Sequence, residues 1–292
     1  MADWYRLIGG GVNAFTVEQA CEAVSRAQRC NSHSSSEQTE RAKHMDPLFD
    51  FSGKVVLVTG GSRGLGYQMV RAFAERGADL VIASRRKESC ESVAAEVRAM
   101  GRRALACGCH VGHWGDIDGL VEAAYAEYGR VDVLINNAGM SPVTPTPAHV
   151  TEELFDKVIG VNFKGPFRLS ALVGQRMAEA GGGCIINVSS SAAIRPIPNA
   201  IPYSGAKAAL NAMAEAFAAE FGGAGVRVNT ISAGPFLTDI SKAWREEDRQ
   251  SAHSALGRPG SPEEVVTTAL YLASPHSTFV TSCLARVDGG LY

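Results

Sequence analysis

The sequence comprises 292 residues, of which 46% are hydrophobic and 20% are charged, with a formal net charge of −2. This balance permits a sizeable core and excludes the strongly basic character of proteins that bind nucleic acid or anionic membranes through charge. The length exceeds that of an ordinary single domain, but α/β domains often reach roughly 250 residues, so we expect one large domain with a small appendage.

The first 44 residues differ in character from the rest. In TVEQACEAVSRAQ (16–28) a Thr-x-x-Gln capping box and apolar residues at helical spacing predict one amphipathic helix. The polar segment 31–44 is expected to be flexible, and Met45 then opens a sequence suited to be a chain start. We interpret residues 1–44 as a dispensable extension, or alternatively as an oligomer contact or regulatory arm, and residues 45–292 as the functional domain.

The cysteines are scattered and form no Cys-x-x-Cys pair; they are Cys21, Cys30, Cys90, Cys107, Cys109, Cys184 and Cys283. Such usage is typical of reduced thiols in the cytosol. The chain start lacks the basic and apolar regions of a secretion signal, and no later segment reaches about 18 uninterrupted apolar residues. We therefore expect a soluble, cytoplasmic protein with neither membrane nor nucleic acid as a partner.

From Lys54 onward, short apolar runs alternate with longer segments of helical period. This alternation is typical of a parallel sheet with helices on both faces, and it predicts a doubly wound, Rossmann-like α/β fold. Apolar stripes at Met69, Val70, Phe73 and Ala74, and again along 210–221, indicate helices packed on the sheet. Seven strands are expected, at 54–59, 78–83, 103–108, 131–136, 184–188, 226–231 and 283–287.

The first expected strand leads into a glycine-rich turn, TGGSRGLG (59–66). Glycines allow close approach of a pyrophosphate, and the free N–H groups and dipole at a helix start favour the anion. A tight strand-to-helix turn without a ligand is the alternative, but the position after the first strand favours a dinucleotide. The candidate cofactor-binding residues here are Gly60, Ser62, Arg63, Gly64, Leu65 and Gly66.

The end of the second strand should indicate which cofactor is used, because an acidic residue there binds the ribose 2′-OH of NAD. This strand ends in Ser84 and Arg85 instead, and Arg85 together with Arg63 can bind a 2′-phosphate. NADP(H) is therefore favoured over NAD(H). The alternative is that one or both arginines are ordinary solvated surface.

Tyr203 and Lys207 lie four residues apart at the start of a helix introduced by Pro202, so they share a face. A nearby ammonium favours phenolate and should bring the pKa of the phenol closer to neutral pH, as a general acid or base requires. Ser190 follows the fifth expected strand, where a hydroxyl can donate to an oxygen that gains charge. A Tyr-x3-Lys pair alone is common by chance.

Together these features resemble the short-chain dehydrogenase/reductase family, in the subgroup with chains of roughly 250 residues. The resemblance covers Phe51 through Tyr292. It rests on TGGSRGLG, NNAG (136–139), Asn162 in GVNFKGPF, Ser190, the Tyr203/Lys207 pair, RVNTISAGPFLT (227–238) and the ending GRPGSPEE…VDGG.

The resemblance implies a role for each catalytic candidate. Tyr203 would exchange a proton with the substrate oxygen, and Lys207 would lower its pKa and hold the nicotinamide ribose. Ser190 would orient the substrate carbonyl, with Ser189 and Ser191 as strand-end polar residues, and Asn162 would position a water for proton relay. The further implied cofactor-binding residues are His110, Val111, Asn137, Ala138, Gly139, Pro235 and Thr238, with Thr238 near the nicotinamide carboxamide.

Three positions depart from the family pattern. His110 stands where the family usually has Asp beside the adenine, so the base would meet a different set of donors and acceptors. Ala233 and Ser282 replace a common Pro and Gly. Cys107, Cys109, His110 and His113 also raise a zinc hypothesis, which we disfavour because the cysteines and His110 point to opposite faces of a strand; no metal is expected.

The loops 140–149 and 192–200 and a lid at about 236–260 are expected to bind the substrate, with Phe236 and Trp244 walling an apolar pocket. Arg195 either meets an anionic group or faces solvent. We expect an NADP(H)-dependent oxidoreductase that interconverts a ketone and a secondary alcohol, with a weak lean towards sugar-acid or 3-oxoacyl substrates. The alternatives are an NAD-dependent enzyme of the same type and a catalytically silent dinucleotide-binding regulator. The resemblance further implies a homotetramer or homodimer.

Overall fold

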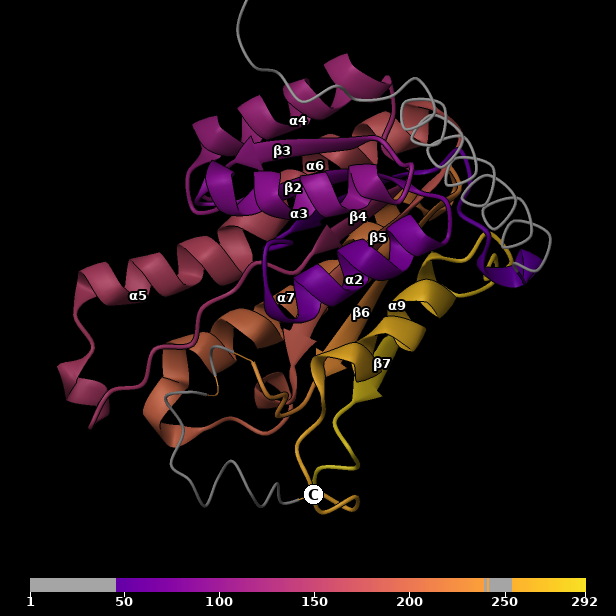
Figure 1. Ribbon diagram of the computed structural model, residues 1–292. Helices are drawn as coiled ribbons and strands as arrows, with labels where there is room; N and C mark the ends of the chain where they lie inside the picture. Colours follow the sequence, from indigo (N-terminus) through magenta and orange to yellow (C-terminus); the bar gives the residue numbers. More distant parts are fainter. Residues whose placement is uncertain (1–45, 239–240, 242–253) are drawn as a thin grey trace, which may run out of the picture. The chain divides into compact units, whose positions relative to one another are not determined.

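Seven parallel strands form one sheet in the part of the chain that the computed structural model describes, which is residues 46–238, 241 and 254–292 (Figure 1). Their order across the sheet is β3-β2-β1-β4-β5-β6-β7, and the expected doubly wound α/β fold is confirmed. The strands are β1 (Val55–Thr59), β2 (Asp79–Ser84), β3 (Ala104–Gly108), β4 (Val133–Asn136), β5 (Gly183–Ser190), β6 (Val226–Ala233) and β7 (Leu284–Val287).

Strands β5 and β6 run further than their apolar segments indicate, to Ser190 and Ala233, which are paired across the two strands. Polar side chains at the ends of these strands interrupt the apolar run in the sequence while the backbone stays in the sheet. This extension carries the serines of β5 to the edge of the sheet where the carboxyl ends of all seven strands lie.

Helices cover both faces of the sheet (Figure 1). One face packs on α2 (Gly64–Glu75), α3 (Lys87–Ala99) and α9 (Val266–Ala273), and the other on α4 (Trp114–Tyr128), α6 (Gly165–Glu179) and α7 (Ile201–Gly222). The expected apolar stripe of α2 is buried, as are Leu210, Met213 and Phe221 of α7. The short 3-10 helices are η2 (Pro47–Phe49), η3 (Pro147–His149), η5 (Ser191–Ala193), η6 (Pro198–Ala200) and η8 (Pro262–Val265).

The chain between β4 and β5 forms a helix interrupted by a π-helical turn: α5 (Glu152–Ile159), the turn η4 (Gly160–Lys164) and then α6. Thr151 caps the start of α5, because its Oγ1 accepts a hydrogen bond from the Leu154 N–H at 3.2 Å. A π-helical turn is rare and is frequently found at functional sites. Here it contains Asn162.

The topology places one crevice at the carboxyl edge of the sheet. The chain leaves β1 towards β2 and β3 and then returns to β4 on the other side of β1, so neighbouring connections diverge between β1 and β4. Ligands of doubly wound sheets bind at such a switch point. The glycine turn after β1, the end of β2 and the NNAG motif after β4 all lie at this edge, as does the end of β5.

Ser282 is the only non-glycine residue with a positive φ in the described ranges, at +56°. That backbone region disfavours a side chain, so a glycine would adopt this conformation with less strain than Ser282 does. The Ser282 N–H donates to the Val228 carbonyl at 2.8 Å, and this bond to β6 helps to hold the conformation.

Some expectations fall outside the described residues: the helix at 16–28, the polar segment 31–44, and most of the lid with Trp244. The fold described above belongs to one compact unit, Pro47–Tyr292. None of the helices in the described ranges combines the length and the apolar character that crossing a bilayer requires.

Candidate active site

Helix α7 places Tyr203 and Lys207 on its first turns, with Pro202 at the helix start, where its missing N–H costs nothing. Lys207 is only 3% exposed, and its Nζ donates to the Val188 carbonyl of β5 at 2.8 Å. The same Nζ lies 5.9 Å from the centroid of the Tyr203 ring. The helical spacing therefore brings the two side chains together beside the end of β5.

The pKa values of this pair are set mainly by burial, which disfavours the charged form of each group. Burial lowers the pKa of Lys207 to about 8. Burial raises the pKa of Tyr203, and a hydrogen bond with Ser190 acts in the opposite direction. Lys207 is not among the causes of the shift in the Tyr203 pKa, so the expected lowering of that pKa by Lys207 stays a prediction.

The three serines at the end of β5 have different surroundings. Ser189 is buried, and its Oγ donates to the Lys207 carbonyl at 3.2 Å, which ties β5 to α7. Ser190 lies near enough to Tyr203 to lower its pKa, and the Ser190 Oγ accepts from the Ala192 N–H at 3.1 Å. Ser191 begins the 3-10 turn η5. Of the three, Ser190 is the serine that shares a site with the tyrosine hydroxyl.

Asn162 is fully buried in the π-helical turn, and both ends of its amide are bonded. Its Nδ2 donates to the carbonyls of Met140 and Val158, each at 2.9 Å, and its Oδ1 accepts from the Met140 N–H at 3.2 Å. A Cβ at Gly139 would lie 3.1 Å from Asn162 Oδ1 and 3.6 Å from Lys207 Nζ. The space above Gly139 is thus bordered by the amide and the amine.

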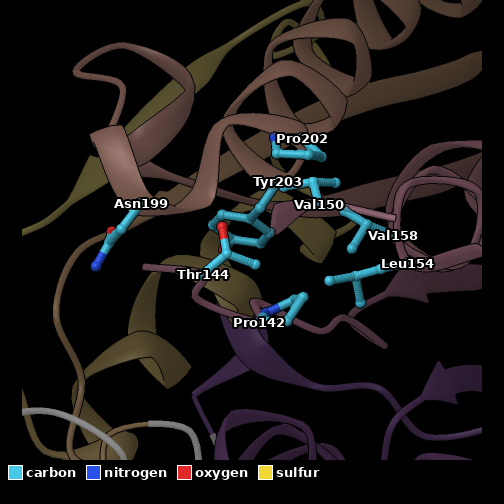
Figure 2. A pocket seen from close by; sticks show the side chains of 8 residues that line it. All are labelled: Pro142, Thr144, Val150, Leu154, Val158, Asn199, Pro202 and Tyr203. Atoms are coloured by element: carbon cyan, nitrogen blue, oxygen red, sulfur yellow. The ribbon is translucent and has the colours of Figure 1, made fainter. Parts of the chain in front are cut away.

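A small pocket lies against the Tyr203 ring, between the loop after β4, helix α5 and the start of α7 (Figure 2). Its walls are mostly apolar, and no charged side chain is among the described residues that line it. The Thr144 N–H donates to the Asn199 carbonyl at 3.0 Å, which joins the two loops at the rim. The lining residues are Pro142, Thr144, Val150, Leu154, Val158, Asn199, Pro202 and Tyr203.

One expectation about substrate residues comes out differently. Phe236 is only 6% exposed and belongs to the apolar cluster shared by α2, α3 and α9, where it lies beside Gly260; it therefore does not line this pocket. Arg195 is exposed on the loop after η5, which agrees with the alternative that it faces solvent. No sequence signal predicted Val150, Leu154 and Val158 as pocket residues, because apolar residues at spacings of four resemble an ordinary buried stripe.

The glycine turn is held tightly against the end of β4. Asn137 Nδ2 donates to the carbonyls of Thr59 and Gly60 at 2.9 and 3.2 Å, and Thr59 Oγ1 accepts from the N–H groups of Asn137 and Ala138. A Cβ at Gly66 would lie 2.3 Å from the Gly60 oxygen, so only glycine fits. The N–H groups of the first turn of α2 have no partner within the helix, and the cradle fits a pyrophosphate.

The end of β2 lies next to this turn. Ser62 Oγ donates to Ser84 Oγ at 3.2 Å, and Arg63 and Arg85 are both exposed. The Thr238 methyl group would lie 3.5 Å from a Cβ at Gly64, so the structure places Thr238 against the glycine turn. The Pro235 carbonyl accepts from the Gly260 N–H at 2.9 Å.

His110 and Val111 follow β3 at the same edge. The His110 ring stacks on His113 with centroids 4.3 Å apart, and Val111 is buried beneath α6. Cys107 and Cys109 both pack with the cluster that lies under α4 and α6. Within the described residues no group of three or more potential metal ligands lies together.

Comparisons with known proteins agree with this geometry. Residues 54–249 match the family model described as short chain dehydrogenase. A D-threitol dehydrogenase from Mycolicibacterium smegmatis is 34% identical over 256 residues, covering 86% of this chain and 98% of that protein. A 3-oxoacyl-(acyl-carrier-protein) reductase from Thermotoga maritima is 35% identical over 241 residues, covering 82% and 98%. The solved structure of a 7α-hydroxysteroid dehydrogenase with NADH and 7-oxo glycochenodeoxycholic acid matches with a TM-score of 0.80 and 30% identity, covering 84% and 96%.

Proposed function

Because the chain belongs to the short-chain dehydrogenase family, and is an oxidoreductase acting on CH–OH and C=O groups with a nicotinamide dinucleotide, we propose a more specific activity. It interconverts a ketone and a secondary alcohol with NADP(H), and Tyr203 is the proton donor and acceptor. The observation that carries this proposal is the placement of Tyr203 beside the buried Lys207 amine, with Ser190 near enough to influence the Tyr203 pKa, at the rim of an apolar pocket.

The bound nicotinamide supplies or accepts the hydride, and the residues of this chain handle the oxygen and its proton. In reduction the carbonyl oxygen gains negative charge, and Ser190 Oγ and the Tyr203 hydroxyl donate hydrogen bonds to it. The raised pKa of Tyr203 keeps the phenol protonated at neutral pH, as a proton donor requires. Lys207, cationic below a pKa of about 8, would hold the nicotinamide ribose, and Asn162 would position a water for proton relay.

Three variants assayed with a panel of ketones test the catalytic assignment. Tyr203→Phe and Ser190→Ala are expected to lower kcat/KM at least about a hundredfold, since each loses a donor to the reacting oxygen. Ser189→Ala is the matched control: it loses a bond to the Lys207 carbonyl, so it should cost about 1 kcal/mol of stability and leave the rate near that of the native chain. Full activity in Tyr203→Phe would refute the assignment. A chain that binds the dinucleotide but reduces no carbonyl compound would support the silent regulator instead.

The preference for NADP(H) is proposed from Ser84, Arg63 and Arg85, because the end of β2 carries no carboxylate to bind a ribose 2′-OH. Arg85→Ala should weaken NADP⁺ binding about tenfold or more and leave the Kd of NAD⁺ unchanged, since one charge-assisted contact is lost. Arg86→Ala, also exposed, is the control. Tighter binding of NAD⁺ than of NADP⁺ by the native chain would establish the NAD-dependent alternative.

The pocket beside Tyr203 is small and has no charged side chain among its described lining residues. We propose that it takes a small uncharged group next to the reacting carbon.

We also propose a cytoplasmic homodimer or homotetramer, with α6 and α7 as contact helices. Sedimentation of the purified protein distinguishes these states from a monomer.

A further inference from the structure

The purine base of the cofactor has a definite place if the proposed dinucleotide site is correct. The glycine turn follows β1, Ser84 and Arg85 follow β2, and β3 is the next strand in the same direction. A dinucleotide whose pyrophosphate lies at the glycine turn, and whose adenine-side ribose lies at the end of β2, therefore extends its base over the end of β3. His110 stands there, and the charge of Arg85 is among the influences that lower the pKa of His110, after burial and His113.

The ring of His110 is held in one orientation. The Gly112 N–H donates to His110 Nδ1 at 3.2 Å, and a Cβ at Gly112 would come within 3.0 Å of the ring. On another side the ring stacks on His113, with an angle of 20° between the planes. The backbone is fixed as well, because the His110 N–H donates to Asp116 Oδ2 at 2.9 Å.

These contacts determine which ring nitrogen carries the proton. A backbone N–H can only donate, so Nδ1 must accept and is unprotonated. Burial lowers the pKa of His110, which keeps the imidazole neutral at pH 7, with its single proton on Nε2. With Nδ1 occupied, His110 offers the base a hydrogen-bond donor and no acceptor.

A donor and an acceptor at this position select different purines. Adenine carries a 6-amino group, which donates, and an N1 that accepts, whereas hypoxanthine carries a 6-oxo group, which accepts. A carboxylate would bind the amino group and repel the oxo group. A histidine Nε2–H can bond either adenine N1 or the hypoxanthine oxygen, so it does not reject the 6-oxopurine.

We propose that His110 acts as a specificity-determining residue that removes discrimination at the purine 6-position, so that the protein binds a hypoxanthine dinucleotide about as tightly as the adenine one. This inference rests on the proposed function, because it takes the dinucleotide site as given. It concerns recognition of the base, which is independent of the proton transfer at Tyr203.

Calorimetric Kd values for NADP⁺ and nicotinamide hypoxanthine dinucleotide phosphate test the proposal without any turnover. The native chain should bind the two within about threefold of each other, and His110→Asp should prefer the adenine form at least about tenfold. The control is His276→Asp, which makes the same change on an exposed loop between α9 and β7, at the opposite edge of the sheet. Its two Kd values should match those of the native chain.

The outcomes separate this proposal from the proposed function. A tenfold or greater preference for adenine in the native chain overturns the role of His110, and this measurement does not depend on any variant folding. Tight NADP⁺ binding with an unchanged ratio in His110→Asp also overturns it and leaves the proposed function standing. Failure of the native chain to bind either dinucleotide overturns both.

Discussion

The site holds the amine of Lys207 in a buried place, although burial disfavours its charged form. An amine that is 3% exposed keeps one backbone acceptor, Val188, and burial lowers its pKa from 10.5 to about 8. At neutral pH the folded chain must hold this charge in a poorly solvated place, whereas the unfolded chain holds it in water. The residue therefore reduces stability at neutral pH in exchange for a cation beside Tyr203.

The sign of the resulting pH dependence follows from proton binding. Between about pH 8 and pH 10.5 the unfolded chain still binds the Lys207 proton and the folded chain has lost it, so stability rises with pH in this window. Relative to Lys207→Met, the native chain should gain about 2 kcal/mol between about pH 8 and about pH 10. Urea unfolding of both proteins at these two pH values measures the gain, and a constant difference would contradict it.

Helical spacing was sufficient to predict that Tyr203 and Lys207 are neighbours, because residues four apart share a face. It could not predict the direction of the tyrosine pKa, which depends on burial by α5 and the loop after β4, distant in sequence. The distinct bonds of Ser189 and Ser190 likewise depend on α7, and nothing in the three-serine run itself separates them.

Among the elements, α6 approaches the end of β3 more closely than a side chain allows. A Cβ at Gly165, the first residue of α6, would lie 2.0 Å from the Val111 carbonyl oxygen. Gly119, in the exposed part of α4, has nothing within 4 Å of a Cβ. Close packing against Val111 therefore requires a glycine at position 165, whereas no contact in the structure requires one at position 119.

Alanine at these two positions should change stability in opposite directions. Gly165→Ala must displace α6 from Val111 and should cost more than about 2 kcal/mol, the usual range for overpacking. Gly119→Ala should stabilise α4 by about 0.5 to 1 kcal/mol, because alanine restricts the unfolded chain and favours the helix. Thermal unfolding of both variants tests the pair; equal effects would show that the close contact carries no cost.

The positions of the strands could be predicted from the sequence, because each parallel strand is a short apolar run. The residues at which β5 and β6 end could not be predicted in this way. β5 and β6 continue through polar residues whose backbone pairs in the sheet, and apolar patterning has no signal for such residues. The π-helical turn was also absent from the prediction, since one extra residue is too small a change to detect in a single apolar stripe.

At the scale of the whole molecule, two apolar clusters hold the helical layers to the sheet, and their members among the described residues lie at or beyond residue 49. The Leu48 carbonyl accepts a hydrogen bond from Ser274 Oγ at 2.6 Å, which ties the chain before β1 to the end of α9. The alternation of strands and helices predicted this architecture correctly. The pocket beside Tyr203 was beyond such reasoning, because it depends on how three loops and helices meet.

A chain that begins at Met45 retains the members of both clusters that lie in the described residues, and we expect it to unfold within about 2 °C of the full chain, with the same kcat/KM. Calorimetry and the ketone assay on both chains check this expectation. A lower melting temperature together with a change in sedimentation would instead assign residues 1–44 to an assembly contact.

The irregular turn at Gly160–Lys164 makes the chain sensitive to changes of length at that point. Deleting a single amino acid there would restore ordinary α-helical winding and leave α6 nearly in place, because five residues of π-helix turn the chain about as far as four residues of α-helix. The local bulge would be lost, however, and with it the backbone position that directs the carboxamide of Asn162 towards Met140. Among related proteins, we therefore expect insertions and deletions to occur in the surrounding loops and to be absent from Gly160–Lys164.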